Sequence, residues 1–161
     1  ISKYLEKYDD FLLINSDTIL DFNIKSFIDF HKKNNFLVSL SGVKMTSTWG
    51  TIIKKVNSDL VKKFAVNSKI DSYMIKGFSN YNSYRNTGIS LISTKCLQFI
   101  NKIYDNNFEI LLYNNYLKSN KVGAKIFNGL WHPIETLKDL NLIKDNAKLN
   151  KKISVFKNKV K

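Results

Sequence analysis

The chain has 161 residues, of which 43% are hydrophobic, 13% aromatic and 24% charged, and its formal net charge is +13 at pH 7. A chain of this length and composition can bury a sizeable core, so we expect one soluble globular domain. Its apolar runs are far shorter than the roughly 20 residues that a membrane-spanning helix requires, which predicts a cytoplasmic protein with no membrane partner. Cys96 is the only cysteine, which excludes an intramolecular disulfide and predicts a core position for its side chain.

The positive charge would suit a nucleic-acid partner, because clustered cations release counterions from phosphate. Its distribution argues against this interpretation. Of the 26 Lys and Arg residues only Arg85 is arginine, and the lysines are scattered along the chain, as are the asparagines. Joint enrichment in Lys, Asn and Ile is typical of an AT-rich genome, so we expect no specific nucleic-acid partner. A lysine-rich RNA-binding domain stays as an alternative that would need a contiguous basic face.

The first part of the chain predicts a strand, a helix and a second strand. A short helical segment over residues 1–8 precedes an apolar run at 10–16, which suits a strand buried on both faces. Residues 23–33 place apolar side chains and His31 on one helical face, and residues 36–43 alternate as a strand does. This order predicts a right-handed βαβ unit with parallel strands.

The rest of the chain predicts a hairpin, a long loop and further helices. Two strand-like runs, 49–53 and 60–66, flank the turn signal Asn57-Ser58-Asp59. The loop at 67–84 is longer than loops in compact domains usually are, unless they bind something or move. The remaining predictions are strands at 85–93 and 122–127, helices at 94–103, 107–119 and about 137–146, and a lysine-rich tail at 147–161 within a single domain.

Asp17 directly follows the apolar run of the first strand. In α/β proteins ligands bind at this edge of the sheet, so Asp17 is a candidate functional carboxylate. A capping role at the end of the strand is the alternative, although Asp21 or Asn23 could cap the next helix equally well.

A second candidate carboxylate, Glu135, lies in a tight turn that holds the only proline. Thr136 and Asp139 beside it form a capping-box-like pair, which explains both of them as helix caps and leaves Glu135 unexplained. If Glu135 and Asp17 converge, their oxygens suit Mg²⁺, which takes one or two protein carboxylates together with substrate phosphates. His132 could also reach such a site, but a lone His beside Trp is more often packed or solvated.

Four pieces follow one another along the chain: Asp17 at a strand end, Trp49-Gly50, Asn86-Thr87-Gly88-Ile89, and the turn from Trp131 to Thr136. Their order resembles that of the sugar-1-phosphate nucleotidyltransferases, and residues 131–139 are most similar to the glucose-1-phosphate cytidylyltransferase branch. This resemblance implies an α/β fold of the nucleotide-diphospho-sugar transferase type, which is a Rossmann-like, mixed and mainly parallel sheet flanked by helices, here lacking its first βα unit.

The resemblance also implies an activity and roles for individual residues. A nucleoside triphosphate and a sugar-1-phosphate would be joined to a nucleotide-sugar, with release of pyrophosphate, for surface polysaccharide synthesis. Asp17 and Glu135, the latter normally aspartate in the family, would be catalytic ligands of Mg²⁺. Gly50, Asn86 and Gly88 would contact the sugar, because glycines let the backbone approach its hydroxyls.

Three departures from the family pattern stand out. The glycine-rich loop that opens the family's domain is absent, so residues 1–161 are expected to be the C-terminal two-thirds of a domain and inactive alone. Ser16 replaces a glycine, and Ala65-Val66-Asn67 replaces a Glu-Lys-Pro triplet whose lysine meets the sugar phosphate. Lys69 or Lys76 could substitute for that lysine.

These departures leave a competing hypothesis. The chain could be a truncated or degenerate relative that binds a sugar nucleotide or a partner subunit without catalysis. The sequence decides neither between these hypotheses nor whether the chain forms a homo-oligomer.

Overall fold

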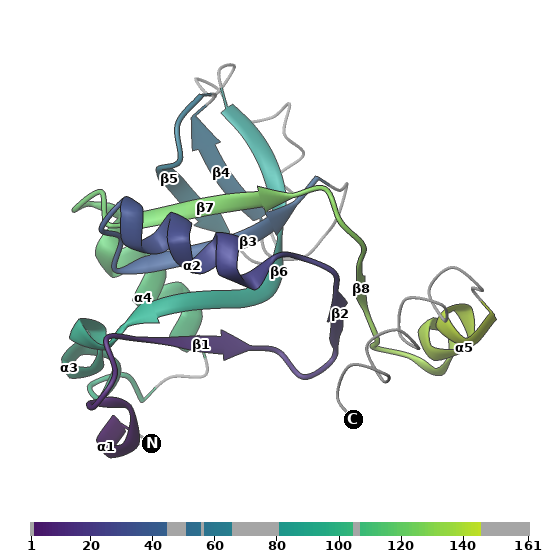
Figure 1. Ribbon diagram of the computed structural model, residues 1–161, viewed down its shortest axis with the longest axis horizontal. Helices are drawn as coiled ribbons and strands as arrows, with labels where there is room; N and C mark the ends of the chain where they lie inside the picture. Colours follow the sequence, from purple (N-terminus) through teal and green to yellow (C-terminus); the bar gives the residue numbers. More distant parts are fainter. Residues whose placement is uncertain (1, 45–50, 56, 66–80, 105–106, 146–161) are drawn as a thin grey trace.

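The computed structural model describes residues 2–44, 51–55, 57–65, 81–104 and 107–145, which form a mixed sheet with helices on both faces (Figure 1). The strands are β1 (Asp10–Ile14), β2 (Thr18–Leu20), β3 (Val38–Val43), β4 (Thr51–Lys55), β5 (Val61–Ala65), β6 (Tyr81–Ser93), β7 (Val122–Phe127) and β8 (Trp131–Pro133). The helices are α1 (Ser2–Leu5), α2 (Ile24–Lys33), α3 (Leu97–Ile100), α4 (Phe108–Leu117) and α5 (Leu137–Asp145), with a 3₁₀ turn, η1 (Thr94–Cys96), before α3.

The 13-residue strand β6 organises the main sheet. β1 pairs with residues 89–93 of β6 and β4 with residues 81–85, while β3 pairs with β6 between residues 85 and 92. Because residues 90–92 pair with both β1 and β3, and Arg85 pairs with both β3 and β4, the strands β1 and β4 share one edge of β6. β7 pairs with the outer edge of β3, and β5 pairs with the outer edge of β4. β2 and β8 form a separate two-stranded sheet.

The predicted α/β domain with a mixed sheet is confirmed, but the expected majority of parallel pairs is not found among the described strands. β3 and β7 are parallel, whereas the other pairs of the main sheet are antiparallel. β1 and β3 do run in the same direction, as the βαβ prediction requires. However, β6 lies between them, because Ile92 pairs with Phe11 on one side and with Val38 on the other. Hydrophobic periodicity identifies strands, and it does not reveal a third strand inserted between two of them.

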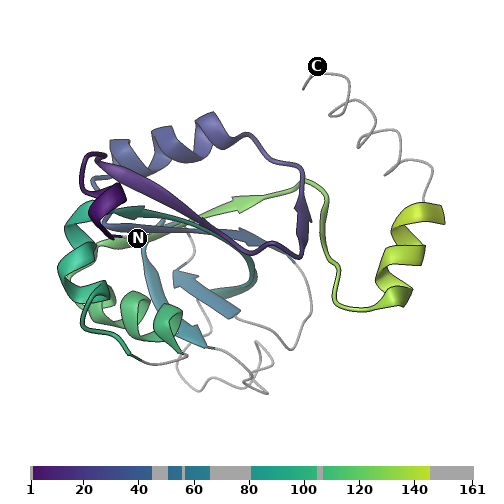
Figure 2. The same ribbon diagram turned by 90° about the horizontal axis from the view of Figure 1, so that it is seen from below.

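Each face of the sheet has its own core. α2 covers one face and α3 and α4 the other (Figure 2). Phe27 of α2 packs with Ile89 and Leu91 of β6, whereas Ile92 faces the larger core with Tyr113 of α4. Successive residues of a strand point to opposite faces, so a strand between these cores is covered on both sides. All six residues of β3 are accordingly buried.

Several other predictions are confirmed. The hairpin is the antiparallel pair β4 and β5, the strand at residues 122–127 is β7, and three predicted helices correspond to α2, α4 and α5. Asn23 is the N-cap of α2, because its side chain accepts a hydrogen bond from the amide of Ser26 at 2.9 Å. Cys96 is fully buried in the larger core.

No helix in the described ranges is both long and apolar enough to cross a membrane.

Four segments differ from the predictions. Residues 81–84, expected in the long loop, begin β6, and the helix expected at 94–103 is a 3₁₀ turn followed by the four-residue α3. The strands β2 and β8 were not predicted. Each has three residues, too few to show a period, and β8 ends at the only proline.

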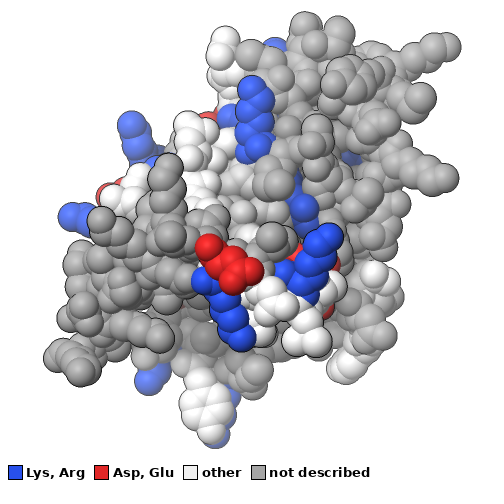
Figure 3. Space-filling view, turned by 90° about the vertical axis from the view of Figure 1, so that its right-hand side faces the viewer, with Lys and Arg blue, Asp and Glu red and all other residues white. Residues whose placement is uncertain are grey.

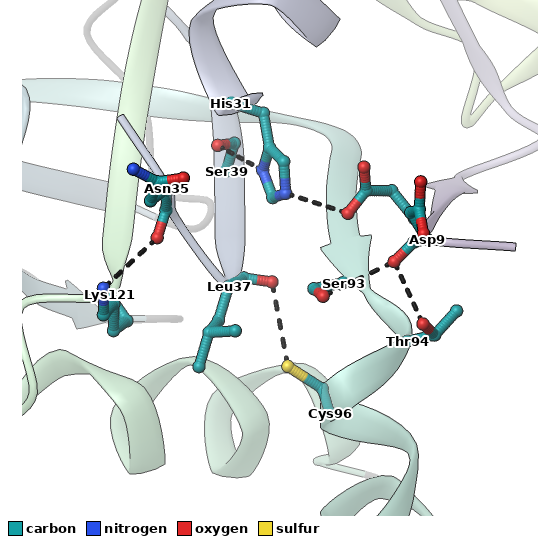
Figure 4. Close-up of polar contacts among 10 residues, drawn as sticks. Asp9, His31, Asn35, Leu37, Ser39, Ser93, Thr94, Cys96 and Lys121 are labelled. Atoms are coloured by element: carbon teal, nitrogen blue, oxygen red, sulfur yellow. Dashed lines mark hydrogen bonds and ion pairs between the residues drawn. The ribbon is translucent and has the colours of Figure 1, made fainter. Parts of the chain in front are cut away.

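At the end of the sheet where β1 begins, His31 is held in a buried polar network (Figure 4). Its side chain is 3% exposed, with Nδ1 at 2.8 Å from Ser39 Oγ and Nε2 at 3.2 Å from Asp10 Oδ1. In the neutral imidazole, Nε2–H donates to the carboxylate and Nδ1 accepts from the serine hydroxyl. Burial lowers the pKa of His31, the carboxylate of Asp10 opposes this shift, and the charge of Lys32 adds to it.

We expect the protein to lose stability below about pH 6.5, the unfolded pKa of histidine. Because the folded state lowers the pKa of His31, the unfolded chain binds more protons in this range, and the free energy of unfolding falls as the pH drops towards the folded pKa. Well above pH 6.5 His31 is neutral in both states and contributes no slope. Urea unfolding between pH 7.5 and 5.5 measures this, and the H31N variant should lose most of the slope. An equal slope in H31N would contradict the assignment.

Candidate functional site

A cavity of about 240 Å³ opens where β1 and β4 separate along their shared edge of β6. Asn86, Thr87 and Gly88 lie between the two paired stretches and line it. The described residues that line the rest of the cavity are Asn15, Asp17, Thr18, Phe64, Arg85, Glu109, Trp131, Pro133 and Glu135. A larger cavity of about 450 Å³ runs along α2, but its described lining is lysines and scattered polar groups without the predicted site residues.

Asp17 and Glu135 reach this cavity through the pairing of β2 with β8. Thr18 pairs with Pro133, and the amide of Ile134 donates a hydrogen bond to the carbonyl oxygen of Asp17 at 2.6 Å. Two segments more than a hundred residues apart are thus joined by backbone hydrogen bonds next to both carboxylates. Both side chains are exposed at the cavity, and Thr18 Oγ1 lies 3.2 Å from Asp17 Oδ1.

The start of α5 fixes the backbone of Glu135. Asp139 Oδ2 accepts hydrogen bonds from the amides of Glu135 and Thr136, at 3.2 and 2.8 Å, and Thr136 Oγ1 accepts one from the amide of Asp139 at 3.2 Å. This is the capping box that the sequence indicates. The Thr136 hydroxyl also donates a hydrogen bond to Asp139 Oδ2 at 2.8 Å. This bond is the largest cause that lowers the pKa of Asp139, and the two amides add to it, so the carboxylate stays ionised and holds the turn.

Arg85 and Trp131 form one wall of the cavity. The indole Nε1 of Trp131 donates to the carbonyl oxygen of Thr87 at 3.1 Å, and the guanidinium of Arg85 stacks over the indole with its carbon 4.3 Å from the ring centroid. Burial lowers the pKa of Arg85, and the negative charge of Glu135 opposes that shift. Arg85 and Glu135 are therefore close enough for their charges to interact.

Gly88 allows the backbone of β6 to turn towards the end of β1. Its φ is +81°, and a Cβ atom there would lie 2.7 Å from Asn15 Nδ2. The amide of Asn15 donates to the carbonyl oxygen of Gly88 at 2.9 Å, and Asn86 Oδ1 accepts from the amide of Gly88 at 3.3 Å. The space that glycine leaves is thus filled by Asn15, which packs the two strands together at the cavity.

Glu109 of α4 is held by groups in the larger core. The fully buried hydroxyl of Tyr113 donates to Glu109 Oε1 at 3.0 Å and lies 2.7 Å from Ser90 Oγ. Burial and the charge of Glu109 raise the pKa of Tyr113, so the phenol stays protonated and donates. This contact fixes the carboxylate of Glu109 at the cavity wall.

The structure brings four of the predicted site residues together: Asp17, Asn86, Gly88 and Glu135 line the same cavity. The other two, Gly50 and Lys69, lie outside the described residues, as do Lys76 and the tail at 147–161. His132 is not among the described lining residues. It lies between Trp131 and Pro133, which both line the cavity, so the alternation of β8 directs it to the other face.

Arg85, Glu109 and Asn15 are lining residues that we did not select from the sequence. Arg85 carried a signal as the only arginine, but nothing in the pattern located it. Glu109 looks like an ordinary acid in the first turn of a helix. Within the described part of the chain, no group of three or more His, Cys, Asp or Glu side chains could hold a metal ion by itself.

Known proteins support the resemblance found in the sequence. No protein-family model matches the chain. A curated relative named "Probable glucose-1-phosphate cytidylyltransferase", from Bacillus subtilis (strain 168), is 24% identical over 149 residues, which are 92% of this chain and 53% of the relative. A crystal structure of a candidate glucose-1-phosphate thymidylyltransferase from Bacillus anthracis, in complex with sucrose, has the same fold, with a TM-score of 0.70 and 16% identity over 92% of this chain and 57% of that chain.

The resemblance to sugar-1-phosphate nucleotidyltransferases is therefore confirmed. The chain spans only a little more than half the length of either protein.

We expect G88A to reduce the free energy of unfolding by about 1–3 kcal/mol, because alanine is strained at positive φ and its Cβ would clash with Asn15. Urea denaturation of G88A, N15A and the double variant measures this. In the double variant the asparagine side chain is absent, so the loss of free energy of unfolding that comes from the clash should disappear. The loss that comes from the positive φ at residue 88 should remain. Additive losses in the double variant would show that the two side chains do not compete for space.

Proposed function

We propose that this chain provides the sugar-binding and metal-binding part of a sugar-1-phosphate nucleotidyltransferase. In the proposed reaction, a phosphate oxygen of the sugar-1-phosphate attacks the α-phosphorus of a nucleoside triphosphate, and pyrophosphate leaves. The observation that carries the proposal is the convergence of Asp17, Asn86, Gly88 and Glu135 on one cavity. The named relatives, a cytidylyltransferase and a thymidylyltransferase for glucose-1-phosphate, support the same substrate class.

Asp17 and Glu135 are suited to hold Mg²⁺. Both are carboxylates at the cavity, and Mg²⁺ commonly takes one or two protein carboxylates and completes its shell with water and substrate phosphates. Glu109 also lines the cavity, but no group of three or more possible metal ligands is found among the described residues, so a pair of carboxylates is what they offer to the ion. When bound, Mg²⁺ would neutralise charge on the phosphates.

The remaining residues position the substrates in this proposal. Asn86 and the backbone at Gly88 contact the sugar, and Glu109, fixed by Tyr113, offers an acceptor to its hydroxyls. Phosphoryl transfer asks little covalent chemistry of a protein, so holding the two anions in line contributes most of the catalysis. The nucleotide-sugar would be formed in the cytoplasm and would serve surface polysaccharide synthesis.

A non-catalytic relative that binds a sugar nucleotide or a partner subunit is the second candidate. It is favoured by Ser16 and by the Ala65-Val66-Asn67 segment, where the family pattern has glycine and a lysine-containing triplet. An RNA-binding role has less support. On the face that carries α5 and β8, the described basic side chains are separated by acidic and uncharged ones (Figure 3).

We expect D17N and E135Q, each in the full-length protein, to lower pyrophosphate release by roughly 100-fold or more, because each removes a charged ligand of the metal. The assay uses glucose-1-phosphate with CTP, dTTP, UTP, GTP and ATP in turn, and Mn²⁺ binding followed by electron paramagnetic resonance reports the metal directly. D29N, which changes an exposed carboxylate on α2 away from this cavity, is the control and should keep activity and Mn²⁺ binding.

Three results would count against the catalytic proposal. Full activity in D17N or E135Q would show that the replaced residue takes no part in catalysis. Unchanged Mn²⁺ binding in either variant would show that the replaced residue does not bind the metal. Saturable binding of a nucleotide-sugar without pyrophosphate release from any triphosphate would establish the non-catalytic candidate.

A further inference from the structure

We propose that Arg85 binds the phosphate group of the sugar-1-phosphate. This inference rests on the proposed function and names the group that recognises the anionic part of its substrate. Three observations carry it: the charge balance of the cavity, the stacking of Arg85 on Trp131, and the position of Arg85 in the sheet.

The charge balance is set by the four ionisable residues that line the cavity in the described part of the chain. Three are carboxylates, Asp17, Glu109 and Glu135, and the fourth is Arg85. A phosphate near these carboxylates is repelled unless a cation lies beside it, and such interactions are strong where water is partly excluded. Arg85 is the cation that the described lining provides, so the phosphate binds most favourably next to it.

The stacking prepares the guanidinium for a phosphate. The guanidinium carbon of Arg85 lies over the indole of Trp131, 4.3 Å from the ring centroid, and that indole is fixed by its hydrogen bond to Thr87. A guanidinium is planar, and its fork of N–H groups matches two oxygens of a phosphate. Because the side chain is held before the ligand arrives, less conformational entropy is lost on binding.

The position of Arg85 also places its charge near the segment that lacks the expected lysine. Thr51 pairs with Arg85 on one side and with Ala65 on the other, so the three residues form a row across β6, β4 and β5. Arg85 therefore lies two strands, about 10 Å, from the beginning of Ala65-Val66-Asn67. Arg85 thus supplies its charge to the cavity from β6, two strands away from Ala65.

Glu135 connects Arg85 to the proposed metal. The charge of Glu135 stabilises the protonated guanidinium, and the same carboxylate is a proposed ligand of Mg²⁺. Asp17, Arg85 and Glu135 line the same cavity, so a phosphate held by Arg85 would share that cavity with an ion held by the two carboxylates.

The test compares R85Q and R85K in the full-length protein by steady-state kinetics. We expect R85Q to raise the KM for glucose-1-phosphate by roughly 10-fold to 100-fold, as for loss of a charged hydrogen-bonding partner. R85K should recover part of this loss, since it keeps the charge without the planar fork. The KM for the triphosphate should change by less than about 3-fold. K95Q removes an exposed charge after the opposite end of β6 and should leave both constants unchanged.

Direct binding separates this inference from the proposed function. By calorimetry, wild-type protein should bind glucose-1-phosphate more tightly than glucose, and R85Q should lose that preference while retaining its thermal midpoint within a few degrees. If pyrophosphate release fails in wild-type protein but this preference depends on Arg85, the inference stands and the catalytic proposal falls.

Four results would overturn the inference. They are an unchanged KM for glucose-1-phosphate in folded R85Q, an effect confined to the triphosphate, an equal preference for glucose-1-phosphate in R85Q, and no preference in wild-type protein. If R85Q does not fold, the same criteria apply to R85M, whose unbranched side chain can still pack on Trp131 and carries no charge.

Discussion

Backbone pairing between two three-residue strands, β2 and β8, is the contact on which the site depends. Strands of this length are marginal by themselves, and the pair is extended by further contacts. The amide of Asp21 donates to the carbonyl oxygen of Leu130 at 2.9 Å, and a Cβ at Gly129 would lie 2.1 Å from the carbonyl oxygen of Asp21. Glycine is thus required for the close approach of the two segments. Without this pairing, Asp17 and Glu135 would have no common cavity.

The pairing of β6 with two different strands along one edge explains why the cavity forms where it does. A strand that kept one neighbour along its whole edge would leave no opening, whereas β6 exchanges β1 for β4 between Gly88 and Arg85. The opposite edge of β6 pairs with β3 through this region, with an irregularity between Leu40 and Gly42. The opening is therefore supported from behind by a buried strand, and the two cores fix its walls from above and below the sheet.

Much of the secondary structure could be predicted from the sequence, because long apolar periods and helix caps are local signals. The order of strands could not, since nothing local shows that β6 lies between β1 and β3. The segment Trp131–Pro133 reads as a turn because it contains a proline, although its pairing with β2 makes it a strand. Proline is tolerated there because β8 is a short strand of a two-stranded sheet.

The candidate site, too, could be predicted from the sequence only in part. Asp17 can be identified because it ends an apolar strand, and Glu135 because it is the acid left unexplained in the proline turn before a helix cap; the resemblance adds Asn86 and Gly88. Arg85 depends on stacking with a tryptophan 46 residues away, and Glu109 depends on a tyrosine whose hydroxyl lies in the core. Contacts of this kind join residues through the fold and leave no pattern in the sequence.

The stacking of Arg85 on Trp131 also gives the protein an intrinsic optical probe. Indole emission responds to a charge moving over the ring, and Trp131 is one of two tryptophans in the chain. Any ligand that draws the guanidinium away from the indole changes that emission without a label or a coupled enzyme. Replacing Trp49 with phenylalanine would leave Trp131 as the one tryptophan, which reports from the wall of the cavity when it is excited selectively.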